Sequence, residues 1–148
     1  MNILIIENEI YLAQKVVSRL LDDGHSCDYI ESPNIDNLTK DYDTILLSTS
    51  LPSALCKNII KKYSENSIIL LLVSYISDET VTNPIKDGAK DYIMKPFIMD
   101  ELIRKIYHYK ECRSIRRELQ TLREYFNFTM AEIDTTDVLL PPSFPTLV

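Results

Sequence analysis

The chain has 148 residues, of which 45% are hydrophobic and 26% are charged, and its formal net charge is -6. This length and composition predict one domain with a single core and an appendage. The acidic balance disfavours non-specific binding of nucleic acid by the whole surface. No apolar run approaches the ~18 residues that a membrane-spanning helix needs, so we expect a cytoplasmic protein.

The first residues, 1–7, lack a basic segment and reach Glu7 after a short apolar run. This pattern predicts a first strand and not a signal peptide. The cysteines, Cys27, Cys56 and Cys112, show neither CxxC spacing nor a neighbouring histidine cluster. We therefore expect reduced thiols, no metal site and no cofactor.

Short apolar runs alternate with helical patterns along the chain. The expected strands are residues 3–6, 26–30, 44–47, 68–73 and 92–94. The helical patterns are residues 11–22, 35–40, 55–63 and a stretch that ends at Gly88. Gly24 and Gly88 each follow such a pattern, where a left-handed cap favours glycine. Continuously apolar runs are typical of parallel strands covered on both faces, so we predict an α/β fold with a doubly wound parallel sheet.

Pro84 interrupts the fourth helical pattern. A proline inside a helix costs ~3 kcal/mol, whereas the first helical position favours it. We expect Asn83 to cap a short helix at residues 84–87, after a long loop at residues 74–82. A longer helix that bends at Pro84 is the alternative.

From residue 100 onward one apolar stripe continues at steps of three and four residues. Its members are Leu102, Ile106, Tyr109, Cys112, Ile115, Leu119, Leu122 and Phe126. We expect the first half of this helix to pack on the sheet and the second half to pair with another helix. Lys and Arg outnumber Glu between residues 104 and 124, so the helix is either a surface for phosphate backbones or a solvated face.

The chain after Phe126 becomes polar and then proline-rich, with Pro141, Pro142 and Pro145 near its end. Prolines at this density exclude a helix or a central strand. We expect a linker toward a further domain, with a frayed tail as the alternative.

Two segments carry a resemblance to a known family. Residues 91–97 read DYIMKPF, and residues 42–52 read YDTILLSTSLP. With these segments the chain resembles the receiver domain of bacterial two-component response regulators over residues 1–112. The resemblance implies a flavodoxin-like, five-stranded parallel sheet of order 2-1-3-4-5 with an extended C-terminal helix. It leaves residues 113–126 as a helical extension and residues 127–148 as a tail or linker to an effector domain.

The resemblance also assigns the residues of a phosphorylation site. Glu7 fills the first of two acidic positions, Asn8 replaces the second acid, and Ser48 replaces the aspartate that accepts the phosphoryl group. The half of the site that binds a phosphoryl group is retained. The resemblance places Ser74, or alternatively Val73, at the hydroxyl switch position, Tyr92 at the aromatic switch position, Lys95 at the lysine position and Pro96 at the position usually held cis.

The substitutions at Asn8 and Ser48 leave Glu7 as the one dependable charged ligand. We therefore expect no dependable Mg²⁺ binding and no acyl-phosphate chemistry. A partly buried Lys95 needs a counter-ion. Glu7 is the only acid that the motif places within reach, so we expect an ion pair between Glu7 and Lys95.

These features predict an atypical receiver that is not an enzyme and that dimerises without phosphorylation. The resemblance implies that it controls a C-terminal DNA-binding domain. The expected dimer interface comprises Tyr92, Ile98, Arg104, Tyr107, Glu111, Ile115, Leu119, Leu122 and Phe126. One alternative is phosphate transfer to Ser48, Thr49 or Ser50. Another is a thiol sensor based on Cys112 or another cysteine, because cations such as Lys110 and Arg113 beside Cys112 favour a thiolate.

Overall fold

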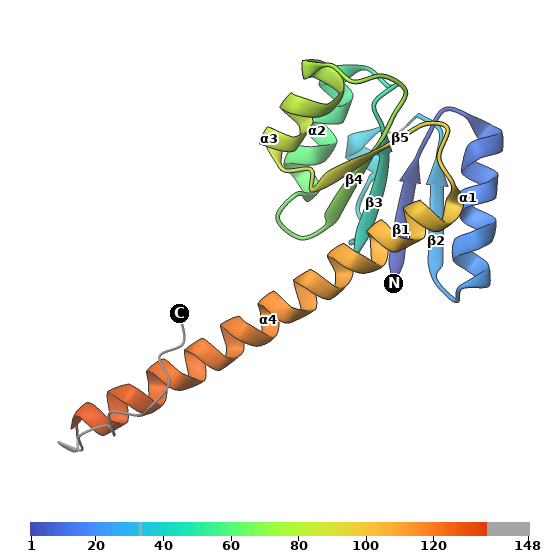
Figure 1. Cartoon of the computed structure of the whole chain (residues 1–148). Coiled ribbons are helices and arrows are strands. Elements are labelled where there is room, and N and C mark those ends of the chain that lie inside the picture. Colours follow the sequence, from blue (N-terminus) through green and yellow to red (C-terminus); the bar gives the residue numbers. More distant parts are fainter. Residues whose placement is uncertain (33, 136–148) are drawn as a thin grey trace. The chain divides into compact units, whose positions relative to one another are not determined.

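The computed structural model describes residues 1–32 and 34–135, with side chains except at residues 35 and 128–135. Within these residues, five parallel strands form one sheet in the order β2-β1-β3-β4-β5 (Figure 1). The strands are β1 (Asn2–Ile6), β2 (Ser26–Ile30), β3 (Thr44–Ser48), β4 (Ile68–Val73) and β5 (Asp91–Met94). The predicted fold class and strand order are confirmed.

Helices cover both faces of this sheet. They are α1 (Ile10–Asp22), α2 (Ser53–Tyr63), α3 (Asn83–Asp87) and α4 (Met99–Thr135). Successive side chains of a strand point to opposite faces. Ile5 and Leu70 therefore pack with α1 and the first turns of α4, whereas Leu4 and Leu71 pack with α2 on the other side. This burial on both faces explains why the central strands are continuously apolar.

The chain divides into two compact units, the first at Met1–Tyr109 and the second beginning at Lys110. Helix α4 contributes to both units and continues past Phe126 to Thr135, so part of the predicted tail is helical. The proline-rich linker expected at the end of the chain lies outside the described residues. Within the described part, no helix is both long enough and apolar enough to cross a membrane.

The helix predicted at residues 35–40 is wrong. The structure has only η1, a short 3-10 turn at Ile35–Asn37. Asn34 organises it, because the Asn34 side chain accepts a hydrogen bond from the Asp36 amide at 3.2 Å. Local bonds of this kind compete with an α-helix, and Leu38 then turns into the core. The segment is also too short to nucleate an α-helix by itself.

The segment before α3 is helical, contrary to the predicted loop. η2, a π-helical turn at Asp78–Thr82, runs directly into α3. Its cap is Ser77 and not Asn83. The Ser77 hydroxyl accepts from the Thr80 amide at 3.1 Å, and the Thr80 hydroxyl accepts from the Ser77 amide at 2.9 Å. A π turn is wider than an α turn, which gives the Pro84 ring room beside the preceding turn. The bent-helix alternative is therefore closer to the structure, although α3 itself is short as expected.

Candidate functional site

The predicted site residues lie at the carboxyl edge of the sheet. Glu7 follows β1, Ser48 ends β3, Ser74 follows β4 and Lys95 follows β5. In a doubly wound sheet this edge is where ligand chemistry gathers. The peptide bond between Lys95 and Pro96 is cis, as predicted.

The Lys95 ammonium is the centre of this cluster. Its Nζ atom lies 2.9 Å from both Oε1 and Oε2 of Glu7. It also donates a hydrogen bond of 3.1 Å to Oγ of Ser48, and Oε1 of Glu9 lies 3.7 Å away. The side chains of Lys95 and Glu7 are only 8% and 0% exposed. The predicted Glu7–Lys95 ion pair is confirmed, and we call Glu7, Ser48 and Lys95 together the clasp.

The two oxygens of Glu7 have different surroundings. Oε1 accepts hydrogen bonds from Lys95 and from the Glu9 amide, the latter at 3.1 Å. Oε2 touches the same ammonium but accepts no well-aligned hydrogen bond from any described residue. Its contact with Lys95 is therefore electrostatic and not directional. A buried carboxylate costs several kcal/mol of desolvation, so Glu7 depends on Lys95 for compensation.

Ser48 is fully buried at the end of β3. Its Oγ atom accepts from Lys95 and from the Ser50 amide, the second bond being 3.3 Å long. The thiol of Cys56 in α2 lies 3.6 Å from the Ser48 carbonyl oxygen. The hydroxyl is thus an acceptor for two nitrogen donors. The contact with Cys56 had no signal in the sequence, because Cys56 falls among the ordinary core positions of an amphipathic helix.

Asn8 and Ser74 lie outside the clasp. Asn8 is exposed, and in the described part of the chain no hydrogen bond joins it to Glu7, Ser48 or Lys95. The Ser74 hydroxyl is also exposed and lies 3.4 Å from the Ser50 hydroxyl. Val73 is buried within β4. Ser74 is therefore the residue that presents a hydroxyl at the end of this strand.

Asp91, at the start of β5, is held by a second set of charge contacts. Its Oδ2 atom accepts from Lys105 at 3.0 Å and from the Tyr109 hydroxyl at 3.0 Å. Burial opposes ionisation of Asp91, but these bonds and the one from the Tyr92 amide outweigh it and hold the pKa of this carboxyl below its ordinary value. Lys105 also donates to the Tyr92 carbonyl at 2.7 Å. The start of β5 is thereby fastened to α4.

No family model matches the chain. The curated protein Response regulator ArlR of Staphylococcus haemolyticus is 36% identical over 112 residues, which are 71% of this chain and 50% of that protein. Transcriptional regulatory protein DltR of Streptococcus agalactiae is 32% identical over 113 residues, or 72% of this chain and 50% of that protein. The solved structure of the Francisella response regulator 1452 receiver domain matches with a TM-score of 0.62 and 25% identity, covering 75% of this chain and 98% of that one. This chain carries a response-regulator receiver domain.

The receiver domain accounts for only part of such proteins. This chain spans about half the length of the curated relatives that it matches, 50% in both cases. These relatives are response regulators and transcriptional regulators by name.

The predicted dimer residues of the receiver domain belong to different elements. Ile98 is exposed after β5. The Tyr107 hydroxyl, by contrast, lies 2.7 Å from Nε2 of His25, which directly precedes β2. Tyr92 belongs to β5, and β2 and β5 are opposite edges of the sheet. Tyr107 thus contacts the residue before one edge strand, whereas Tyr92 belongs to the other edge strand.

The other predicted interface residues lie along α4. Arg104, Glu111, Ile115, Leu119 and Leu122 are exposed, and Phe126 is half-buried. Exposed aliphatic side chains at helical spacing are unusual on a fully solvated helix. Ile115, Leu119 and Leu122 are therefore the predicted interface residues that are both apolar and exposed on α4.

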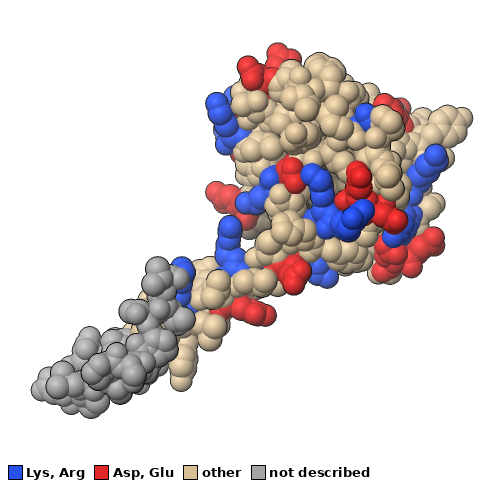
Figure 2. Space-filling model, in the orientation of Figure 1, with Lys and Arg blue, Asp and Glu red and all other residues tan. Residues whose placement is uncertain are grey.

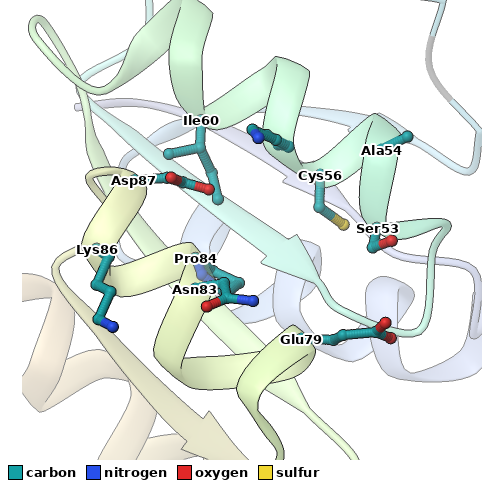
Figure 3. A pocket seen from close by; sticks show the side chains of 10 residues that line it. Ser53, Ala54, Cys56, Ile60, Glu79, Asn83, Pro84, Lys86 and Asp87 are labelled. Carbon is teal, nitrogen blue, oxygen red and sulfur yellow. The ribbon is translucent and has the colours of Figure 1, made fainter.

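The receiver domain also has a hollow that the sequence did not indicate. It measures about 440 Å³ and lies between α2 and the η2–α3 segment (Figure 3). Cys56 and Ile60 line it from α2, and Pro84 and Lys86 line it from α3. Burial raises the pKa of the Cys56 thiol to about 11, so this thiol stays protonated at neutral pH. The hollow depends on the path of η2, which is why sequence patterns missed it.

Proposed function

We propose that this receiver domain is a phosphorylation-independent regulatory and dimerisation module of an atypical response regulator, and that it is not an enzyme. The observation that carries the proposal is the buried Ser48 hydroxyl, hydrogen-bonded to Lys95 at 3.1 Å. Ser48 occupies the position to which the family resemblance assigns the phosphoacceptor aspartate. A serine hydroxyl needs a base to act as a nucleophile, and among the described residues no histidine contacts Ser48.

The donor set at this position does not fit a Mg²⁺ ion. Mg²⁺ prefers an octahedral shell of oxygens with one or two carboxylates. Among the residues that the structure describes, Glu7 is the only buried carboxylate, and both of its oxygens lie 2.9 Å from the Lys95 ammonium. Ser48 is neutral and Asn8 is exposed. A divalent cation would have to displace Lys95, so no step of the proposed function uses a metal ion.

In this proposal the clasp is a permanent contact of Lys95, in place of a contact that depends on phosphorylation. In the proposal, Glu7 holds Lys95 in position with no phosphoryl group, and Ser48 completes the contact from β3. The ion pair joins the segment after β1 to the segment after β5. A charge pair built into the chain has no phosphorylated and unphosphorylated states. We therefore propose that the receiver domain keeps one conformation and that its output is constitutive.

We further propose that a C-terminal DNA-binding domain carries the output, that the protein is a cytoplasmic homodimer and that the receiver domain itself does not read DNA. The names of the relatives and their greater length support this. On the face shown in Figure 2, acidic and basic groups are interspersed and form no continuous basic patch. Binding of a phosphate backbone depends on clustered Lys and Arg, so the visible face favours a protein partner over nucleic acid.

A thiol sensor is the second candidate, and the exposures favour one cysteine for it. Cys112 is exposed, whereas Cys56 is buried and Cys27 is half-buried. Burial raises the pKa of the thiols of Cys27 and Cys56, which suppresses their thiolates. Mild peroxide treatment followed by intact-mass measurement tests this candidate. A mass increase that disappears in Cys112→Ser would support it.

Acetyl phosphate tests the main proposal. The full chain is incubated with acetyl phosphate and Mg²⁺, and its intact mass is measured before and after acid treatment. We expect no acid-labile phosphoryl adduct, because Ser48 and Asn8 remove the nucleophile and a metal ligand together. The matched control is the double variant Asn8→Asp with Ser48→Asp, which is expected to gain an adduct. Stoichiometric acid-labile phosphorylation of the wild-type chain would refute the proposal, and an acid-stable adduct on Ser48, Thr49 or Ser50 would support phosphate transfer to a hydroxyl side chain.

A further inference from the structure

The second half of α4 presents an apolar stripe to solvent. Ile115, Leu119 and Leu122 are 49%, 45% and 54% exposed. Together with Cys112 and Phe126 they follow one another at steps of three, four, three and four residues. In the heptad notation of coiled coils this spacing places Cys112, Leu119 and Phe126 at a positions and Ile115 and Leu122 at d positions. The same stripe runs within one continuous helix, α4.

Charged residues flank this stripe, with acidic residues on one side and basic residues on the other. Glu111 and Glu118 occupy successive g positions, and Arg116 and Arg123 occupy successive e positions. None of these four has a residue of opposite charge three or four positions away, where helical ion pairs form. Within the described residues, none of the four makes an ion pair in its own chain. Their charges are therefore available to a second helix.

We propose that α4 pairs with α4 of a second copy of this chain as a parallel, in-register, two-stranded coiled coil. Glu111 of each copy then pairs with Arg116 of the other, and Glu118 pairs with Arg123. The inference rests on the proposed dimer and adds the polarity and register of its helices.

The signs of the charges select the parallel orientation. In a parallel pair each g residue faces the e residue five positions further along the other helix. That rule matches Glu111 with Arg116 and Glu118 with Arg123, and two-fold symmetry repeats each match. An antiparallel pair instead sets g against g and e against e. Glu would then face Glu and Arg would face Arg, and like charges across an interface suppress the pairing.

Cys112 is a native probe of this orientation. As an a residue in a parallel, in-register pair, it faces Cys112 of the second copy across the two-fold axis. In an antiparallel pair a positions face d positions, so Cys112 lies opposite Leu122 when Ile115 faces Leu119. The two Cys112 residues are then on the order of 15 Å apart, from a helical rise of ~1.5 Å per residue.

Sedimentation and disulfide cross-linking of the full chain test the proposal together. The chain is first brought to a concentration at which sedimentation velocity shows a dimer, and then oxidised briefly with copper phenanthroline. We expect a covalent dimer on a non-reducing gel that is absent in Cys112→Ser. A monomer in sedimentation would defeat the proposed dimer itself. A dimer that does not cross-link, although Cys112 reacts with maleimide, would overturn the parallel register and leave the dimer intact. A trimer would contradict two-stranded pairing.

Charge exchange provides the second, independent test. The variant Glu111→Arg with Glu118→Arg places arginine at all four flanking positions. From the usual strength of surface ion pairs, its dimer Kd is expected to rise about tenfold. The matched control adds Arg116→Glu and Arg123→Glu, which exchanges the signs and keeps the composition, and should restore the wild-type Kd. An unchanged Kd in the first variant, or equally weak binding in the control, would overturn the pairing scheme. Circular dichroism verifies that both variants keep the helix.

Discussion

Among single residues, Lys95 is the one on which the site depends. Its ammonium is shared between Glu7 and Ser48, and all three side chains are largely buried. Buried ion pairs add little net stability compared with apolar packing, yet removal of one partner leaves an uncompensated charge. We therefore interpret the clasp as a contact that fixes the relative positions of the carboxyl ends of β1, β3 and β5.

The first prediction concerns Glu7→Gln. This variant leaves the Lys95 ammonium without its buried counter-charge. The free energy of unfolding is expected to fall by roughly 1–3 kcal/mol, measured by urea denaturation with an unchanged m-value. The matched control is Glu9→Gln, because Glu9 is 57% exposed and 3.7 Å from the same ammonium. That change should cost at most about 0.5 kcal/mol. Equal losses in the two variants would show that the clasp has no special role.

The second prediction concerns the pH dependence that Asp91 confers. Its folded-state pKa lies below its ordinary value, so the charged carboxylate stabilises the fold. That stability is fully present above the unfolded-state pKa of ~3.9 and is lost as the pH falls through the lower folded-state pKa. The stability difference between wild type and Asp91→Asn should therefore shrink as the pH is lowered from about 5 toward 2. Denaturation midpoints at several pH values measure it, and a constant difference would contradict the contact with Lys105.

At the scale of elements, α4 links the receiver domain to the proposed assembly. Leu102 and Ile106 bury its first turns against the sheet, whereas Ile115, Leu119 and Leu122 are exposed. An apolar stripe that a monomer exposes to water is a candidate interaction surface. The helix therefore has two apolar parts, one packed on the sheet and one exposed.

The third prediction concerns that exposed stripe. Leu119→Glu with Leu122→Glu places charges in the proposed helix pair and should abolish the dimer without lowering the stability of the receiver domain. Ser114→Glu with Thr121→Glu adds the same charges on the side of the helix away from the stripe, and this control should remain dimeric. Sedimentation velocity gives the mass, and thermal unfolding verifies the fold. A dimer that survives the leucine changes would show that this helix is not the dimerisation element.

The elements differ in how far the sequence could predict them. The strands were predictable because residues 45–47 and 68–73 are apolar without interruption, as is typical of strands buried on both faces. Gly88 was predictable as a cap, and its φ of 132° agrees. η2 was not predictable, because it depends on mutual hydrogen bonds between Ser77 and Thr80 that accommodate Pro84.

The site shows the same division. The Glu7–Lys95 pair followed from the family motif and from the need of a buried ammonium for a counter-ion. The contact between Tyr107 and His25 could not be foreseen, because these residues are far apart in the chain and meet only where α4 crosses the sheet. Helical periodicity gives the face of a residue on its helix, but not the strand that this face meets.

At the scale of the whole molecule, the proposal is that assembly and output do not wait for a phosphoryl group. The clasp supplies a fixed charge contact, and α4 supplies the proposed dimer interface. An isologous dimer places two copies of any following domain side by side. Such a pair suits DNA sites built from two half-sites.

The most direct test of this account is sedimentation velocity of the full chain, without treatment and after incubation with acetyl phosphate and Mg²⁺. We expect a dimer in the untreated sample, because Ile115, Leu119 and Leu122 drive pairing without any modification. We also expect the same dissociation constant after treatment, because Ser48 accepts no phosphoryl group. A chain that sediments as a monomer until acetyl phosphate is added, and as a dimer afterwards, would contradict the claim that this receiver domain works without phosphorylation.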